Sequence, residues 1–302
     1  MTSSLTALAL LLLLAPLLSG VVTWTKAKLT GRRGAPVWQL YADLRKLAGR
    51  GAIYSVTTTW AFRLAPVAVL ATTVAATSLV PLDGRMALIH FSGDAVAFAY
   101  VLAMGRFLLV LGALDTGSSF EGMGASREVS FASLVELGLF ISFVALSLAT
   151  RDLTLTGMFG VPLTERRAAA GPALVMIGAS LFALLLAECA RVPVDDPTTH
   201  LELTMIHEVM VLDHSGPDLA LILYASSLKL ALFGTLVVRV LVPSHGVPLL
   251  VNMGVLLLGL LGIAVAVGIV ESTTARLRLP RVPLYVAGGS ALGMFGLVLL
   301  LR

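Results

Sequence analysis

The chain has 302 residues, of which 58% are hydrophobic and 13% are charged, and its mean hydropathy is +0.96. This apolar surface exceeds what one water-soluble domain of that length can bury, so the composition excludes such a domain and indicates an integral membrane protein. The net charge of +4 could suggest nucleic-acid binding, but the basic residues flank apolar segments, which favours a role in membrane topology. The single cysteine, Cys189, excludes an intrachain disulfide and cannot alone hold an iron–sulfur cluster or a structural zinc.

The apolar runs are long enough for helices to cross a bilayer, whose hydrocarbon core is about 30 Å thick. Helices satisfy their own backbone hydrogen bonds in lipid, so the sequence predicts an all-α, polytopic membrane domain over residues 1–302. The expected spans, in chain order, are Leu5–Trp24, Trp60–Val80, Met86–Leu114, Val129–Thr150, Gly171–Ala190, Pro217–Val242, Val247–Val270 and Val282–Leu301.

The connections between these spans differ in charge. Those after the first, third, fifth and seventh spans carry most of the lysines and arginines. The other connections hold only Arg85, Arg151, Arg166, Arg167 and Arg239. The positive-inside rule therefore predicts that the basic connections lie in the cytoplasm and that both termini lie outside the cytoplasmic (inner) membrane.

The first connection contains apolar residues at helical spacing. Val37, Leu40, Tyr41, Leu44 and Leu47 recur on one face after a Gly–Ala–Pro breaker. This pattern predicts a short cytoplasmic amphipathic helix at the membrane interface. The pattern leaves two roles open, which are anchoring on anionic lipid and docking of a cytoplasmic partner.

Five ionisable residues fall inside the expected spans. Asp94 and Arg106 lie in the third span, Glu136 in the fourth, Glu188 near the end of the fifth, and Lys229 in the middle of the sixth. An ionisable group in hydrocarbon costs at least a few kcal/mol, so such residues indicate an ion or proton path. The alternative is that they form ion pairs that hold the helices together, although Asp94 and Arg106 are about 18 Å apart along one helix and cannot pair with each other.

The fifth connection has the highest density of charge. Pro193 and Pro197 end the preceding helix, and Asp195 or Asp196 can cap a new one. The expected new helix carries Glu202, His207 and Glu208 and ends before the segment from Asp213 to Pro217.

Three histidines, His200, His207 and His214, recur in this connection at intervals of seven residues. On one helix they would lie on one face in steps of about 10 Å, which is too far apart for ligands of a single metal ion. The sequence therefore predicts no metal site. Solvated surface histidines and a proton gate that titrates near neutral pH both stay open.

The segment Glu188-Cys-Ala-Arg191-Val-Pro193-Val-Asp195-Asp-Pro197, followed by Glu202-Leu, resembles a known signature. It is similar to the Glu-x-x-Arg-x-Pro-Phe-Asp-x-Pro…Glu-Leu motif of membrane subunit 1 of respiratory complex I and its hydrogenase relatives. Further matches are Gly31–Pro36 with Gln39, Gly112–Ser118, Gly124–Glu128 with Glu136, and Glu271–Leu279. The resemblance thus covers essentially the whole chain.

Several matches are closer to the hydrogenase branch, which includes the formate hydrogenlyase and hydrogenase-4 membrane subunits. Complex I proteins usually carry an Arg-x-Arg-Tyr-Asp segment where this chain has Arg276-Leu-Arg278-Leu-Pro, and further acidic residues where it has Thr198 and His200. These departures weigh against quinone binding. A quinone-binding subunit of NADH–quinone oxidoreductase and, from another class, a free-standing ion transporter stay open as alternatives.

The resemblance implies a non-catalytic membrane anchor that couples electron transfer in its partners to translocation of protons or sodium. The partners it implies are hydrogenase-like large and small subunits and a ferredoxin-like subunit on the cytoplasmic side, with antiporter-like subunits in the membrane. Iron–sulfur clusters and a nickel–iron site would belong to those partners, with no cofactor bound by this chain.

The resemblance also assigns roles to individual residues. The implied path comprises Glu128, Glu136, Glu188, Arg191, Asp195, Glu202, Lys229, Arg127 and, from its position in the third span, Asp94. The implied partner-docking loop contains Asp196, His200, His207, Glu208 and Asp213. Asp195 and Glu202 are expected to lie against the partner.

Overall fold

The computed structural model describes residues 2–160, 167–196, 205–242 and 247–301. Within these ranges every regular element is a helix, and eight of the helices are long and apolar enough to cross a membrane, as predicted. The eight are α1 Thr2–Leu29, α3 Trp60–Ser78, α4 Asp94–Asp115, α5 Ser119–Thr150, α7 Arg167–Glu188, α9 Gly216–Leu241, α10 Leu249–Thr273 and α11 Val282–Leu301. The shorter elements are α2 Gln39–Ala48, α6 Leu155–Gly160, α8 His207–Met210 and the 3₁₀ turn Leu279–Arg281.

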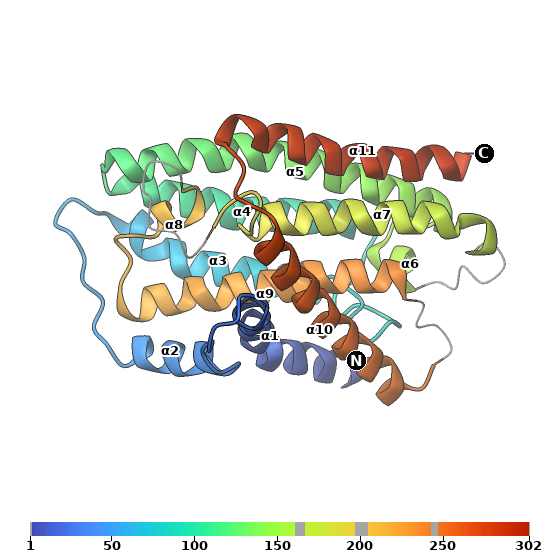
Figure 1. Ribbon diagram of the computed structural model, residues 1–302, viewed down its shortest axis with the longest axis horizontal. Helices are drawn as coiled ribbons and strands as arrows, with labels where there is room; N and C mark the ends of the chain where they lie inside the picture. The colour runs from blue at the N-terminus through green and yellow to red at the C-terminus, as the bar shows by residue number, and fades with distance from the viewer. Residues whose placement is uncertain (1, 161–166, 197–204, 243–246, 302) are drawn as a thin grey trace.

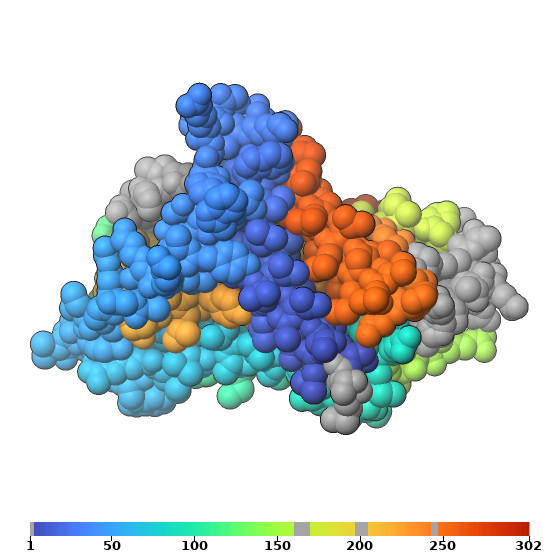
Figure 2. Space-filling model, turned by 90° about the horizontal axis from the view of Figure 1, so that it is seen from below, coloured from blue at the N-terminus to red at the C-terminus, as the bar shows by residue number. Residues whose placement is uncertain are grey.

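Helix α9 lies at the centre of the bundle. It packs against α1, α3, α7 and α10, and 72% of its most apolar stretch is buried by protein. In Figure 1, α5, α7, α9 and α11 run along the long axis of the molecule, while α10 crosses α9 obliquely. Figure 2 shows α1 and α10 side by side on another face, with the end of α1 projecting from it.

Two predicted helix starts are wrong. Helix α4 begins at Asp94 and not at Met86, because residues 79–93 form turns that end at Gly93, whose φ of 93° disfavours other residues. Helix α5 begins at Ser119, ten residues before the predicted start at Val129. Its first turns carry charged side chains, so hydropathy excludes them from a span although they continue the same helix.

The predicted amphipathic helix is present as α2. Its predicted apolar face is partly buried against α1 and α9, and Tyr41 donates a hydrogen bond to the carbonyl of Leu13. Arg45 and Lys46 are exposed, as expected for the polar face. This helix therefore packs against the sides of α1 and α9.

The prediction for the fifth connection is largely wrong. Residues from Cys189 to Asp195 are mostly buried and fold back among the helices, so this part of the connection is not a surface loop. Helix α8 is a single turn that ends at Met210, so His207 and His214 do not lie on one long helix. His200 and Glu202 lie outside the described residues.

Arg239 is not in a connection, as the charge count assumed, but inside α9 with 3% of its surface exposed. Its guanidinium donates to Asn252 Oδ1 at 2.7 Å and to the carbonyl of Leu82, and Asn252 donates to the carbonyl of Asp83. These bonds join α9 and α10 to the turns before α4.

Replacing Arg239 by glutamine is expected to lower the free energy of unfolding by about 3 kcal/mol, because buried hydrogen bonds to a charged group are lost. Thermal unfolding of the purified protein in detergent measures this change. The exposed Arg85 lies in the same turns, and Arg85→Gln should change the free energy of unfolding by less than about 0.5 kcal/mol. Equal unfolding temperatures for the two variants would show that the Arg239 network contributes nothing.

Candidate functional site

Arg106 binds carboxylates from two neighbouring helices. Its Nη1 lies 2.6 Å from Glu136 Oε1, its Nη2 lies 2.7 Å from Glu188 Oε1, and its Nε lies 3.6 Å from Glu128 Oε1. Glu128 and Glu136 come from α5, and Glu188 is the last residue of α7. The guanidinium therefore brings together three acids that belong to two separate helices.

Lys229 completes this group, which we call the Arg106 cluster (Arg106, Glu128, Glu136, Glu188 and Lys229). Lys229 Nζ lies 3.2 Å from Glu188 Oε1, the same oxygen that accepts from Arg106. The exposed fraction of the side chain is 4% for Glu188 and 32% for Glu136. The cluster thus runs from a buried centre to a partly accessible acid.

The charges of the Arg106 cluster do not balance when every member is ionised. Three carboxylates face two cations, so the cluster carries one negative charge in excess. Burying net charge is unfavourable, and uptake of one proton makes the cluster neutral. All three acids contact one guanidinium, so each of them is a candidate to carry that proton.

Asp195 organises the segment that follows Glu188. Its carboxylate lies 2.8 Å from Arg276 Nη2 and accepts hydrogen bonds from the backbone N–H groups of Ile206 and His207 at 3.0 and 3.1 Å. It therefore binds the backbone at the start of α8, but the N-cap residue of that helix is Ile206, so neither Asp195 nor Asp196 is the N-cap that was predicted. The expectation that Asp195 lies against a partner is wrong, since its side chain is 2% exposed within this chain.

Glu271 of α10 is the centre of a second ionic group, the Glu271 cluster (Lys26, Arg191 and Glu271). Its carboxylate lies 2.8 Å from Lys26 Nζ and 3.4 Å from Arg191 Nη1, and its side chain is fully buried. The cluster joins α1 and α10 to the buried segment after α7. Arg191 and Asp195, which the sequence placed in one group, therefore pair with different residues, Glu271 and Arg276.

Small cavities connect these groups. A cavity of about 140 Å³ is lined by Leu40 of α2, Arg191, Asp195 and His207. It shares His207 and other lining residues with a second cavity of about 30 Å³, which is bounded by Arg106, Glu128, Glu188 and Lys229. The two cavities therefore lie next to each other between α2 and the Arg106 cluster, and each has room for at least one water molecule.

Burial lowers the pKa of both His207 and His214 to about 4. Lys229 adds to this effect at His207. The ring of His214 stacks on Phe62 with centroids 3.9 Å apart. These two histidines are therefore neutral at pH 7, which agrees neither with solvated surface histidines nor with a gate that titrates near neutral pH.

Other predicted residues lie apart from the Arg106 cluster. Asp94 is fully buried at the start of α4, about 18 Å along that helix from Arg106, and accepts a hydrogen bond from the N–H of Leu155 at 2.7 Å. Arg127 donates to the carbonyl of Met205 at 2.9 Å and holds the segment before α8.

Three members of the predicted docking loop lie within the described residues besides His207. Asp196 and Glu208 are half-buried, whereas Asp213 is exposed. His207 is also half-buried, and it lines both inner cavities, one of them together with Lys229. Only part of the predicted loop is therefore on the surface of this chain.

The residue pattern did not predict a role in the site for Lys26, Glu271 or Arg276. Each lies near the end of a span, where charged residues are common. The pattern also missed Glu121, whose carboxylate is 1% exposed and accepts a hydrogen bond from the N–H of Asp213 at 3.4 Å. A signal was available for Glu121, because it lies seven residues before Glu128 and so on the same face of one helix.

A model of the family described as NADH dehydrogenase matches residues 2–293. The chain belongs to this family. Among its relatives, hydrogenase-4 component C of Escherichia coli (strain K12) is 32% identical over 282 residues, covering 89% of this chain and 86% of the relative. Formate hydrogenlyase subunit 4 of the same organism is 30% identical over 298 residues, covering 95% and 94%.

The fold of this NADH dehydrogenase family member is also similar to a chain of the membrane-bound sulfane sulfur reductase, an archaeal respiratory membrane complex. The TM-score is 0.81, and the similarity covers 99% of this chain and 98% of that one. Sequence identity is 13%, so this likeness concerns the fold alone.

Proposed function

We propose that the chain is the membrane anchor and coupling subunit of a complex I-like oxidoreductase of the hydrogenase type. In this role it links electron transfer in a cytoplasmic arm to translocation of protons or sodium. The Arg106 cluster is the observation that carries the proposal, because it gathers three acids and two bases inside a membrane domain. The two bacterial relatives, which match most of the chain, are hydrogenase-type subunits by name.

The geometry supports a specific sequence of events. A proton enters through the cavity between α2 and α8, reaches Glu188 and Lys229, and leaves the chain by way of Glu136. Lys229 and Arg106 share one oxygen of Glu188, so movement of either cation changes how strongly that acid holds a proton.

The buried segment after α7 supplies the mechanical link to a partner. Arg191 and Asp195 follow Glu188 by three and seven residues and are held by Glu271 and Arg276. A displacement of these pairs by a cytoplasmic partner would shift Glu188 against Arg106. Redox chemistry outside the chain would thereby alter the protonation of the cluster.

In the proposed assembly, hydrogenase-like large and small subunits and a ferredoxin-like subunit bind at the end of the bundle that carries α2 and α8. Antiporter-like subunits bind near Glu136, the most exposed acid of the cluster. Both termini then lie outside the cytoplasmic membrane. The cavity near α2 is small and partly polar, which supports a water path more than a quinone site in this chain.

Purification from native membranes in mild detergent tests the assignment as a whole. We expect subunits with iron–sulfur clusters to copurify with this chain, and redox-driven ion uptake in vesicles made from the same membranes. The alternative of a free-standing transporter predicts that the chain purifies alone and moves ions in liposomes without any redox partner. That result would overturn the proposed function.

Replacing Asp195 by asparagine is expected to weaken either binding of the cytoplasmic subunits or coupling by at least about tenfold, because it breaks a buried ion pair of a kind worth about 2–5 kcal/mol. Asparagine can still accept hydrogen bonds from the N–H groups of Ile206 and His207, so these bonds should persist. Copurification and redox-driven ion uptake measure the two effects. Asp152→Asn, at the opposite end of the bundle, should leave both unchanged, and equal behaviour of the two variants would contradict the role of Asp195.

A further inference from the structure

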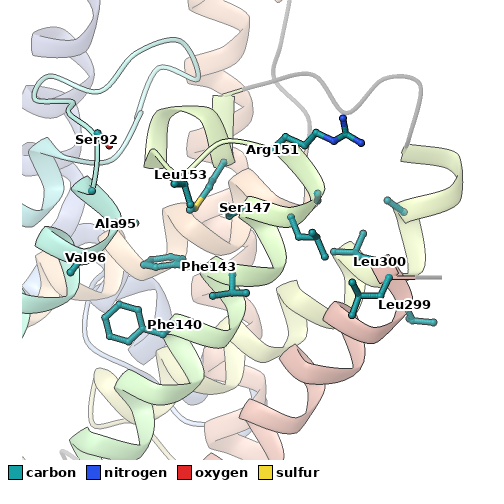
Figure 3. A pocket seen from close by; sticks show the side chains of 17 residues that line it. Ser92, Ala95, Val96, Phe140, Phe143, Ser147, Arg151, Leu153, Leu299 and Leu300 are labelled. Atoms are coloured by element: carbon teal, nitrogen blue, oxygen red, sulfur yellow. The ribbon is translucent and has the colours of Figure 1, made fainter.

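A wide apolar groove lies at the end of α4 and α5 opposite to the Arg106 cluster. Its volume is about 1180 Å³, and its walls come from α4, α5, α6, α7 and α11 (Figure 3). Most of the lining consists of bulky apolar side chains, among them Phe140, Phe143, Val144, Leu148 and Leu299. The proposed ion path uses none of these residues.

The groove has the length of one leaflet of the bilayer. On α5 its lining extends from Phe140 to Ala149, just before Arg151 at the mouth, and this stretch of ten residues corresponds to about 15 Å of helix. The hydrocarbon core of a bilayer is about 30 Å thick, so half of it is about 15 Å. With Thr150 at the membrane surface as the last residue of α5, Phe140 lies near the midplane.

Arg151 places a positive charge at the mouth of this groove. It directly follows the end of α5 and is exposed, and Figure 3 shows it at one end of the pocket, with Phe140 at the other. Among the residues that the structure describes, no carboxylate forms an ion pair with its guanidinium. The groove thus presents apolar walls in the hydrocarbon region and the positive charge of Arg151 at the depth of the lipid headgroups. A lipid with a negatively charged headgroup is complementary to such a surface.

The backbone at Arg151 is strained. Its φ of 59° and ψ of 30° are left-handed, a conformation that costs a residue with a side chain more than it costs glycine, which is common at this position after a helix. Glycine would therefore fit this position with less strain than arginine does.

We propose that this groove binds one phospholipid with an anionic headgroup, whose phosphate contacts Arg151 and whose acyl chains lie along α5 between Phe140 and Leu148. A helix of a neighbouring subunit is the competing occupant. Contacts between membrane helices favour small residues that let the backbones approach, whereas most of this lining is bulky. Among the described residues of the lining, the bulky apolar majority and the cation Arg151 therefore favour lipid.

The test uses the assembled complex purified from native membranes in mild detergent, with tightly bound phospholipids counted per complex by mass spectrometry. Arg151→Gly removes the charge and also the left-handed strain, so the fold should not be weakened. We expect its affinity for anionic phospholipid to fall roughly fivefold, the effect of one basic side chain near anionic lipid. Val144→Trp, which fills the groove from an exposed position, should displace the same lipid.

The matched control is Arg85→Gly, which removes an exposed arginine at the same end of the bundle but outside the groove. It should retain as much anionic phospholipid as the unmodified chain. Equal retention in all variants would overturn the proposal. A photo-crosslinker at position 144 in native membranes gives a second readout: a phospholipid adduct supports the site, and an adduct with another membrane subunit overturns it.

Discussion

Replacing Glu188 by glutamine is expected to reduce ion translocation at least about tenfold while the partners retain their redox activity with an artificial acceptor. Glutamine has nearly the same shape but cannot bind and release a proton. One oxygen of Glu188 accepts from both Arg106 and Lys229, so this single change affects both cations of the cluster. Redox-driven acidification of inverted membrane vesicles measures translocation, and copurification of the partners verifies assembly.

The variant Glu136→Gln serves as the comparison for Glu188→Gln. Of the two cations in the Arg106 cluster, only Arg106 pairs with Glu136, which is also the most exposed acid of the cluster. Water can therefore replace part of the role of Glu136. We expect a smaller loss of translocation than for Glu188→Gln. If neither variant pumps less than the unmodified complex, the proposed path is wrong.

Lys229 should tolerate neither arginine nor methionine, and each replacement should lower translocation about tenfold or more. Lys229 lies in the middle of α9 and its ammonium group contacts Glu188 at 3.2 Å. Arginine keeps the charge but hardly ever releases a proton, and its guanidinium must enter the small cavity already occupied in part by Arg106. Methionine keeps the approximate length of the side chain but removes the charge.

Lys46→Arg is the control for this pair, since Lys46 lies on the exposed face of α2 and should tolerate the change. The ratio of ions moved to electrons transferred distinguishes loss of coupling from loss of assembly. Full coupling with Lys229→Arg would mean that Lys229 forms a structural ion pair with Glu188 and takes no part in proton transfer.

Hydropathy and helical periodicity were sufficient to predict the membrane architecture. Each span is a local property, since about 20 apolar residues must form a helix in lipid whatever their neighbours are. The same logic identified Arg106, Glu136, Glu188 and Lys229, because a charge inside such a run is costly wherever it occurs. The amphipathic pattern of α2 was equally local.

Predictions from local sequence patterns were wrong in the connections, where the chain is not in a regular helix. The turns before α4 and the buried segment after α7 contain prolines, glycines and charges that suggest surface loops, yet much of their length is covered by other helices. The histidine spacing was misleading for the same reason, because α8 ends after one turn. Whether a connection is buried depends on what packs over it.

The sequence by itself determined which residues carry charge into the membrane, and only the tertiary structure decided which of them meet. Arg106 contacts acids of α5 and α7, whereas Asp94, on the same helix as Arg106, lies about 18 Å away from it. Glu271 of α10 likewise pairs with Lys26 of α1, although the two residues lie near opposite ends of the chain. Periodicity fixes the face of a helix on which a side chain lies, but pairing between helices depends on which faces are packed together and at what depth, and that depends on the whole bundle.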